Sequence, residues 1–171
     1  MQIRYPASLA AVLALLVSNS GFAAECSGFL KSDEIVRCLQ RPLTRGLPVI
    51  GRTNPEPAPT VRLQVNFAFN SSRLTNQGTA ALDRLGLALI DPALHSARFE
   101  IAGHTDAVGS DEFNLRLSEA RAATVRDYLV RRFDIGGDRL ATVGYGRTRL
   151  YDPAHPASGV NRRVQITNLG E

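Results

Sequence analysis

The chain is poor in several residue types that often mark a function. It has no tryptophan, one methionine, one lysine and two cysteines among 171 residues, and its three histidines are scattered. Neither the cysteines nor the histidines have the spacing of a metal site, so we expect no metal and no cofactor. All but one of the 20 basic residues are arginines, which are interspersed with 16 acidic residues rather than gathered into runs. This pattern does not require a nucleic-acid partner.

Residues 1–23 are typical of a secretory signal. Arg4 supplies the positive start, residues 7–17 form an apolar run too short to span a bilayer, and Gly21-Phe22-Ala23 offers small residues for cleavage. A buried N-terminal helix is the alternative. We predict that the mature chain begins near Ala24, which lowers the formal net charge from +4 to +3 because Arg4 is lost. No later segment is apolar for long enough to cross a membrane as a helix.

The two cysteines follow this segment closely. A lipoprotein signal would place a small residue directly before the acylated cysteine, whereas Glu25 precedes Cys26. We therefore expect Cys26 and Cys38 to pair as a disulfide, which would persist in the oxidising compartment that a secretory signal predicts. Closing a loop of this size stabilises a fold by roughly 3 kcal/mol in the chain-entropy model.

Composition divides the mature chain into two parts. Residues 24–59 comprise the disulfide-closed segment, with a short amphipathic helix beginning near Ser32, and then a linker rich in proline. Such a linker builds neither a helix nor a sheet ladder. We place the boundary between Asn54 and Thr60, so that residues 60–171 form the main domain.

Hydrophobic periodicity in this domain predicts four strands and two helices. Strict alternation over residues 61–70 is typical of a strand, and Leu82, Leu85 and Leu89 share one face of a helix that follows Thr75. A second strand around residues 99–101 precedes a long helix over residues 111–133, whose expected core positions are Leu115, Ala122, Val125 and Leu129. Two short strands, at residues 140–145 and 163–168, complete an α+β, two-layer sandwich with helices on one face of a mixed four-stranded sheet.

Polar residues of the long helix form a candidate ligand site. Asn114, Ser118 and Arg121 are spaced at i, i+4 and i+7, so they share one helical face and can converge with Asp106 in the preceding loop. Arg121 could hold a carboxylate bidentately, and Asp106 could hold an ammonium group. A zwitterionic ligand needs such a pair of opposite charges. The alternative is that Asp106 and Arg121 simply pair with each other.

Several motifs resemble the OmpA-like C-terminal domain. They are Gly103-His104-Thr105-Asp106, Gly109, Asn114, Leu117-Ser118, Arg121-Ala122, Val125, Gly144-Tyr145-Gly146, Asn161-Arg162-Arg163-Val164 and the opening at residues 67–74. The resemblance implies a βαβαββ fold that binds peptidoglycan non-covalently through the diaminopimelate of its stem peptide. It further implies that Asp106 engages the ammonium and Arg121 the carboxylate, and that Thr105, Asn161 and Arg162 border the site.

We therefore expect a binding module rather than an enzyme, located in the periplasm or associated with the outer membrane. We expect it to anchor or position an envelope component at the cell wall, with an outer-membrane or envelope protein as a further partner. One alternative is a cell-wall hydrolase that uses Asp106 with His104 or Asp111. Another is a periplasmic protein-interaction module in which residues 26–60 recognise a partner.

Overall fold

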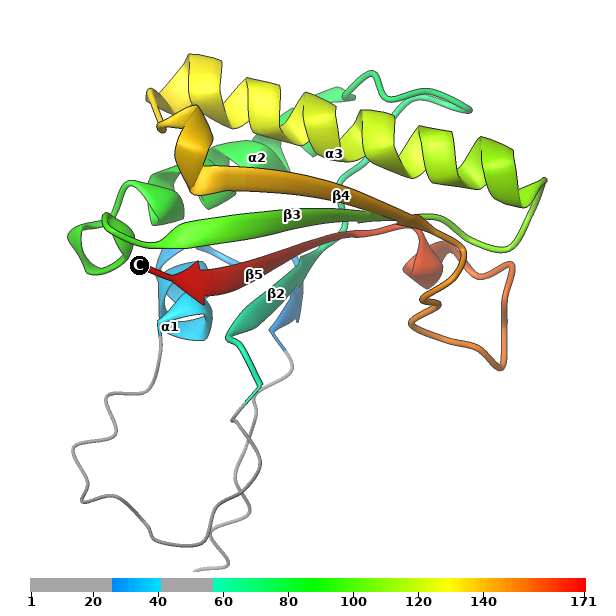
Figure 1. Cartoon of the computed structure of the whole chain (residues 1–171), viewed down its shortest axis with the longest axis horizontal. Helices are drawn as coiled ribbons and strands as arrows, with labels where there is room; N and C mark the ends of the chain where they lie inside the picture. Colours follow the sequence, from blue (N-terminus) through cyan, green and yellow to red (C-terminus); the bar gives the residue numbers. More distant parts are fainter. Residues whose placement is uncertain (1–25, 41–56) are drawn as a thin grey trace, which may run out of the picture.

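The computed structural model describes residues 26–40 and 57–171 (Figure 1). The expected signal, residues 1–23, and most of the expected linker lie outside the described residues. The described helices and strands are, in chain order, β1 (Ser27–Gly28), α1 (Ser32–Leu39), β2 (Thr60–Leu63), α2 (Asn76–Leu89), β3 (Arg98–His104), α3 (Asp111–Phe133), β4 (Leu140–Gly146) and β5 (Val164–Gly170), joined in part by short 3₁₀ turns.

The strands form one mixed sheet in the order β1-β2-β5-β3-β4. Strand β5 lies antiparallel between β2 and β3, whereas the outer pairs β1/β2 and β3/β4 are parallel. The predicted α+β class is confirmed. The sheet has five strands instead of four because Ser27 and Gly28, which precede the expected domain, pair with Arg62 and Leu63.

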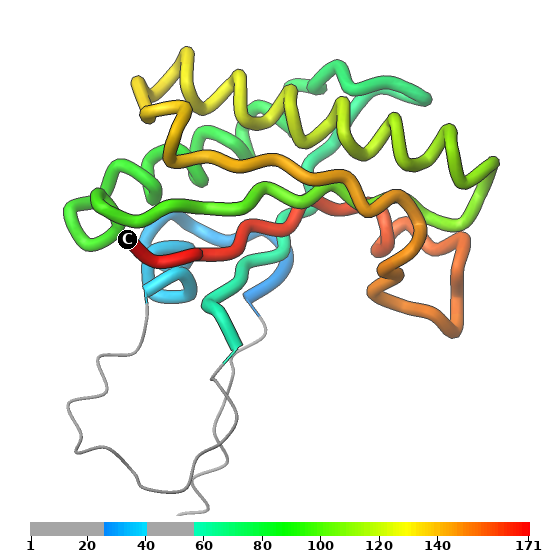
Figure 2. The backbone as a smooth tube through the Cα atoms, viewed as in Figure 1, coloured from blue at the N-terminus to red at the C-terminus, as the bar shows by residue number. Residues whose placement is uncertain are grey.

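The helices pack on one face of this sheet. Helix α3 runs along β3 and β4, α2 contacts α3, and α1 contacts both α2 and β2 (Figures 1 and 2). Side chains alternate along the strands, so Val61, Phe99 and Ile166 are fully buried beneath the helices. The predicted core positions Leu82, Leu85 and Leu89 of α2 are fully buried as well.

The segment before the linker contributes to the same core. Ile35 and Leu39 of α1 are fully buried, and the Asn168 side chain of β5 donates a 2.8 Å hydrogen bond to the backbone oxygen of Leu39. The predicted disulfide between Cys26 and Cys38 is present, with 6.0 Å between the two Cα atoms. The division of the chain between residues 54 and 60 stays a prediction, although structure on both sides of it shares one core.

Two local predictions were wrong. The strand expected over residues 61–70 ends at Leu63. The chain then turns back, so that Phe67 forms a β-bridge with Leu74 and Phe69 is 93% exposed. Leu115 was expected in the core but is exposed, since the buried face of α3 near its start is polar and includes Asn114 and Ser118. Across residues 26–40 and 57–171, none of the helices has the length and apolar character needed to cross a membrane.

Candidate functional site

A close crossing of α3 over β3 and β4 sets the position of the site. A Cβ atom at Gly103 would collide with the backbone oxygen of Ser118, and one at Gly144 would lie 2.6 Å from the Ser118 Oγ. The Ser118 hydroxyl is fully buried, donates to the Leu115 backbone oxygen and accepts from the Gly146 amide at 2.9 Å. Ser118 therefore fastens α3 to β4, and both of these hydrogen bonds are to backbone groups of the chain.

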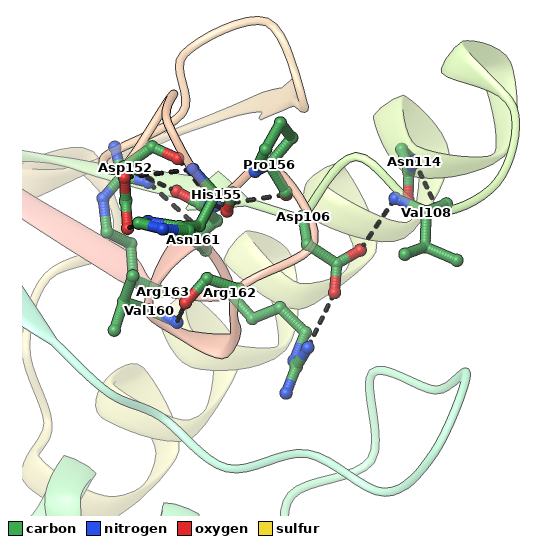
Figure 3. Close-up of polar contacts among 11 residues, drawn as sticks. Asp106, Val108, Asn114, Asp152, His155, Pro156, Val160, Asn161, Arg162 and Arg163 are labelled. Atoms are coloured by element: carbon green, nitrogen blue, oxygen red, sulfur yellow. Dashed lines mark hydrogen bonds and ion pairs between the residues drawn. The ribbon is translucent and has the colours of Figure 1, made fainter.

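The Asp106 side chain is held in the loop between β3 and α3. Its Oδ1 accepts from the Val108 amide at 3.1 Å, and its Oδ2 accepts from Nη1 of Arg162 at 2.7 Å (Figure 3). The Asn114 side chain donates to the Val108 backbone oxygen at 2.9 Å. Asn114 thus stabilises the turn that orients the carboxylate, while Arg162, from the segment before β5, neutralises it.

Arg121 lies on the buried face of α3 and is 9% exposed. Its Nε donates to the Ser71 backbone oxygen at 3.1 Å, and its Cζ lies 5.0 Å from the ring centroid of Phe67. None of the described ion pairs includes Arg121, so the predicted alternative of a direct pair with Asp106 is not formed. Burial lowers the pKa of Arg121, the charge of Arg162 lowers it further, and Asp106 opposes the shift.

A cavity of about 460 Å³ lies beside these charges. Arg121 and Arg162 are the predicted site residues that line it, and the ion pair places Asp106 next to Arg162. The remaining lining residues are Gln64, Val65, Asn66, Phe67, Thr75, Asn76, Gln77, His104, Gly159 and Arg163. The first residues of α2 therefore line the cavity, where the positive end of the helix dipole favours an anion.

Asn161 positions the segment that carries Arg162. It is fully buried, its Oδ1 accepts from the Asp152 amide at 2.8 Å, and its Nδ2 donates to the backbone oxygens of His155 and Pro156 (Figure 3). The Pro156 oxygen also accepts from the Ala107 amide at 2.9 Å. Asn161 therefore joins the 152–156 loop to the Asp106 loop, and its amide makes these contacts with the chain itself.

Thr105 and His104 are buried beside Asp106. The Thr105 amide donates to the Gly146 backbone oxygen at 2.9 Å, while its hydroxyl and both His104 ring nitrogens have no hydrogen-bond partner among the described residues. Burial, followed by the charge of Arg163, lowers the pKa of His104 to about 3.

The acids of the hydrolase alternative have partners other than histidine. Asp106 bonds Val108 and Arg162, and Asp111 bonds Arg147. The acid and histidine pairing required by the hydrolase alternative is thus not assembled.

One wall of the cavity was not predicted from the sequence. The segment from Gln64 to Gln77 brings Phe67 beneath Arg121, and the Asn66 side chain donates to Gln77 at 2.8 Å. Residues 67–74 formed part of the resemblance, which was the available signal. The strand expected over residues 61–70 hid this wall of the cavity, because a continuous strand would carry these residues away from Arg121. The chain instead folds back, so that Phe67 lies against the Arg121 guanidinium.

Comparisons with known proteins agree with this fold. The family model described as "OmpA family" matches residues 66–163, more than half of the chain. Outer membrane porin F of Pseudomonas aeruginosa is 34% identical over 78% of this chain, which spans only 38% of that relative. Other curated relatives, such as outer membrane protein A of Serratia marcescens, are also much longer, and the match spans 24% of that protein.

Solved structures give the same result. The peptidoglycan-associated lipoprotein from Burkholderia pseudomallei is 29% identical, with a TM-score of 0.51 over 61% of this chain and 87% of that chain. The cell wall anchor of the T6SS from Pseudomonas aeruginosa is 26% identical, with a TM-score of 0.54 over 66% of this chain and 81% of that chain. The chain therefore belongs to the OmpA family.

Proposed function

We propose that this domain binds peptidoglycan non-covalently, through the diaminopimelate of the stem peptide. Arg121 binds the carboxylate of that residue and Asp106 binds its ammonium group. The names of two similar structures, a peptidoglycan-associated lipoprotein and a cell wall anchor, support the ligand class. The partly buried charges beside a cavity support the assignment of the two residues.

The burial of Arg121 and the groups around it are the main support for this proposal. Its guanidinium is buried and lines the cavity, yet the groups that meet it are a backbone oxygen and an aromatic ring. A buried charge that lacks an opposite charge is costly, and a bound carboxylate would compensate it. Because Nε is taken by Ser71, a carboxylate would bind through the two Nη atoms.

Asp106 supplies the opposite charge. Its side chain is 12% exposed and already pairs with Arg162, whose side chain is 53% exposed. A carboxylate has about four lone-pair sites, so Asp106 can accept from a ligand ammonium while it keeps one of its present donors. Arg162 then borders the ligand. Asn114, Ser118, Thr105 and Asn161 act behind this pair by holding its loops.

The site implies a place in the cell envelope. Peptidoglycan contact requires the domain to lie in the periplasm or on the inner side of the outer membrane, and the predicted signal at residues 1–23 and the disulfide agree with export. We propose that the protein positions an envelope component at the wall, with residues 24–59 joining the wall-binding domain of residues 60–171 to that component.

Competition between two stem peptides tests the proposal. Purified mature protein is incubated with insoluble peptidoglycan, and the bound fraction is displaced with a soluble stem peptide that carries either diaminopimelate or lysine at the same position. Lysine retains the ammonium group but lacks the second carboxylate, so the diaminopimelate peptide should compete better. Arg121→Ala should abolish that preference. The exposed Arg131, changed to Ala, is the control for loss of one positive charge.

The test has a clear contrary result. If the Arg121→Ala protein is folded and still prefers the diaminopimelate peptide to the same degree as the wild type, Arg121 does not bind the carboxylate. If soluble stem peptides of neither kind displace the wild-type protein, the stem peptide is not the ligand.

A further inference from the structure

Three arginines and two tyrosines gather on the face of the sheet that the helices do not cover. Arg62 lies between the buried residues Val61 and Leu63 of β2, so its side chain points to the opposite face. Tyr145 follows Gly144, whose missing side chain would point at Ser118, and it therefore points away from α3. Arg149, Tyr151 and Arg163 contact these residues. We call the five residues Arg62, Tyr145, Arg149, Tyr151 and Arg163 the arginine–tyrosine cluster.

The rings of the cluster hold the cations in place. The Cζ atom of Arg149 lies 3.7 Å from the ring centroid of Tyr145. The ring of Tyr151 has Arg62 at 5.1 Å and Arg163 at 5.7 Å from its centroid. Each guanidinium is thus within the range of a cation–π interaction, which orients the charge without neutralising it.

Within residues 26–40 and 57–171, no carboxylate forms an ion pair with these three arginines. Among the ion pairs of the described residues, none includes Arg62, Arg149 or Arg163. Burial lowers the pKa of Arg163 to about 10, and the charge of Arg62 contributes to the shift. The charges of all three arginines also lower the pKa of His104, whereas the backbone of Arg149 raises it. The cluster therefore combines like charges at close range, which favours an anionic ligand.

The arginines differ in how many donors they have left. Arg163 donates through Nη2 to the backbone oxygen of Arg149 at 3.0 Å and through Nη1 to that of Asn161 at 3.3 Å. In contrast, in the described part of the chain the guanidinium groups of Arg62 and Arg149 donate no hydrogen bond to the protein. Arg163 thus holds the cluster together, and Arg62 and Arg149 present free donors to a ligand.

His104 provides a second indication of a ligand. It is 2% exposed, neither of its ring nitrogens has a hydrogen-bond partner among the described residues, and its ring centroid lies 5.4 Å from that of Tyr145. It also lines the cavity together with Arg163. A buried imidazole without hydrogen bonds costs free energy, which a ligand oxygen could recover.

We propose that the arginine–tyrosine cluster is a binding site for a phosphate monoester. Arg62 and Arg149 donate hydrogen bonds to the phosphate oxygens, and Arg163 adds the third positive charge. Planar guanidinium groups match phosphate oxygens in pairs, and a group of nearly two negative charges suits three cations better than a single carboxylate does. Arg163 and His104 also line the cavity beside Arg121, so the two proposed sites adjoin, but Arg62 and Arg149, the proposed phosphate donors, do not line that cavity. The phosphate proposal does not depend on the contacts of Asp106 and Arg121.

Titration of the purified mature protein tests the site. Glucose 1-phosphate is the soluble probe, and phosphatidylcholine vesicles with and without phosphatidic acid present the same group on a lipid surface. Because the chain has no tryptophan, the ring resonances and emission of its tyrosines can be followed directly. We expect saturable changes at Tyr145 and Tyr151 with at least one probe. The response to one or both probes identifies a soluble or a lipid-borne source.

Matched variants complete the experiment. Arg62→Ala and Arg149→Ala should each weaken binding by about tenfold to a hundredfold, because each removes a charge-assisted hydrogen bond. Arg131→Ala should leave it unchanged, and a melting curve verifies folding of every variant. If Arg131→Ala weakened binding as much as the cluster variants, the loss of affinity would come from net charge alone, and the proposal would be overturned. So would the absence of saturable binding, or equally tight binding of glucuronate, which carries only a carboxylate.

Discussion

Asp106 and Arg162 form an ion pair beside the cavity, with 2.7 Å between Oδ2 and Nη1. This pairing leaves the buried guanidinium of Arg121 without a carboxylate among the described residues. One shielded anion and one uncompensated cation therefore lie close together, and Asp106 acts on the pKa of Arg121 without bonding to it. A ligand with one ammonium and one carboxylate would complement both.

Replacing Asp106 by Asn should weaken binding to peptidoglycan by about tenfold to a hundredfold, because one charge-assisted hydrogen bond is lost. Unlike Arg121→Ala, this change should weaken the lysine and diaminopimelate peptides equally, since both carry the ammonium group. The Asn oxygen can still accept from Val108, so the melting temperature should stay close to that of the wild type. Sedimentation with insoluble peptidoglycan measures the affinity, and Asp138→Asn on the exposed surface is the control. Unchanged affinity of the Asp106→Asn variant would show that Asp106 does not bind the ligand.

Ser118→Ala should lower stability and leave the affinity of the folded protein unchanged. The change removes the acceptor for the buried Gly146 amide, and an unsatisfied buried group costs about 1 to 3 kcal/mol. Urea denaturation measures the loss, and peptidoglycan binding is measured well below the melting temperature. A variant of normal stability with reduced affinity would instead mean that the hydroxyl contacts the ligand.

The buried His104 should make the protein less stable at acidic pH. Its pKa is about 3 in the folded state, below the ordinary 6.5, so the unfolded chain binds a proton that the folded chain does not. Stability is therefore lost as the pH falls from about 6.5 towards 3, by up to roughly 1.4 kcal/mol per pH unit from this group. Unfolding free energies of the wild type and His104→Gln, compared at several pH values, isolate the contribution. Parallel pH profiles for the two proteins would contradict it.

The disulfide should be complete in the exported protein, with no free thiol until reduction. Reduction should lower the free energy of unfolding by roughly 3 kcal/mol, because the bridge restricts the unfolded chain. Peptidoglycan binding should persist, since Cys26 and Cys38 do not line the cavity. Thiol titration, a melting curve and sedimentation before and after reduction test the three statements. Loss of binding in a reduced protein that is still folded would show that the N-terminal segment helps to form the site.

A fragment of residues 57–171 should fold and bind alone, with reduced stability. It retains four strands, α2 and α3, but it loses Ile35 and Leu39, which are fully buried in the whole protein, and it leaves the Asn168 amide without its acceptor. Leu39→Ala in the full chain is the matched variant and should cost about 2 to 5 kcal/mol. A cooperative melt below that of the full chain would support the boundary. An unfolded fragment would show that α1 is required for the core.

The sequence by itself determined the elements that depend on local periodicity. Helix α3 occupies the predicted residues 111–133, and the apolar spacing of Leu82, Leu85 and Leu89 defined the buried face of α2. The i, i+4, i+7 spacing also placed Asn114, Ser118 and Arg121 on one buried face. Helical and strand periods are local properties of the chain, so they can be read before any long-range contact is known.

The tertiary structure alone decided which charges meet. Asp106 and Arg162 are 56 residues apart, and Arg121 bonds a backbone oxygen 50 residues before it, so local spacing could not assign either partner. The chain turns after β2 although its sequence continues to alternate. This turn brings Phe67 to Leu74 and to Arg121, an arrangement that the alternation could not predict. Likewise, α1 packs in the same core, although a proline-rich segment separates it from the other helices in the sequence. Such pairings depend on the whole fold, since each partner comes from a different element of the chain.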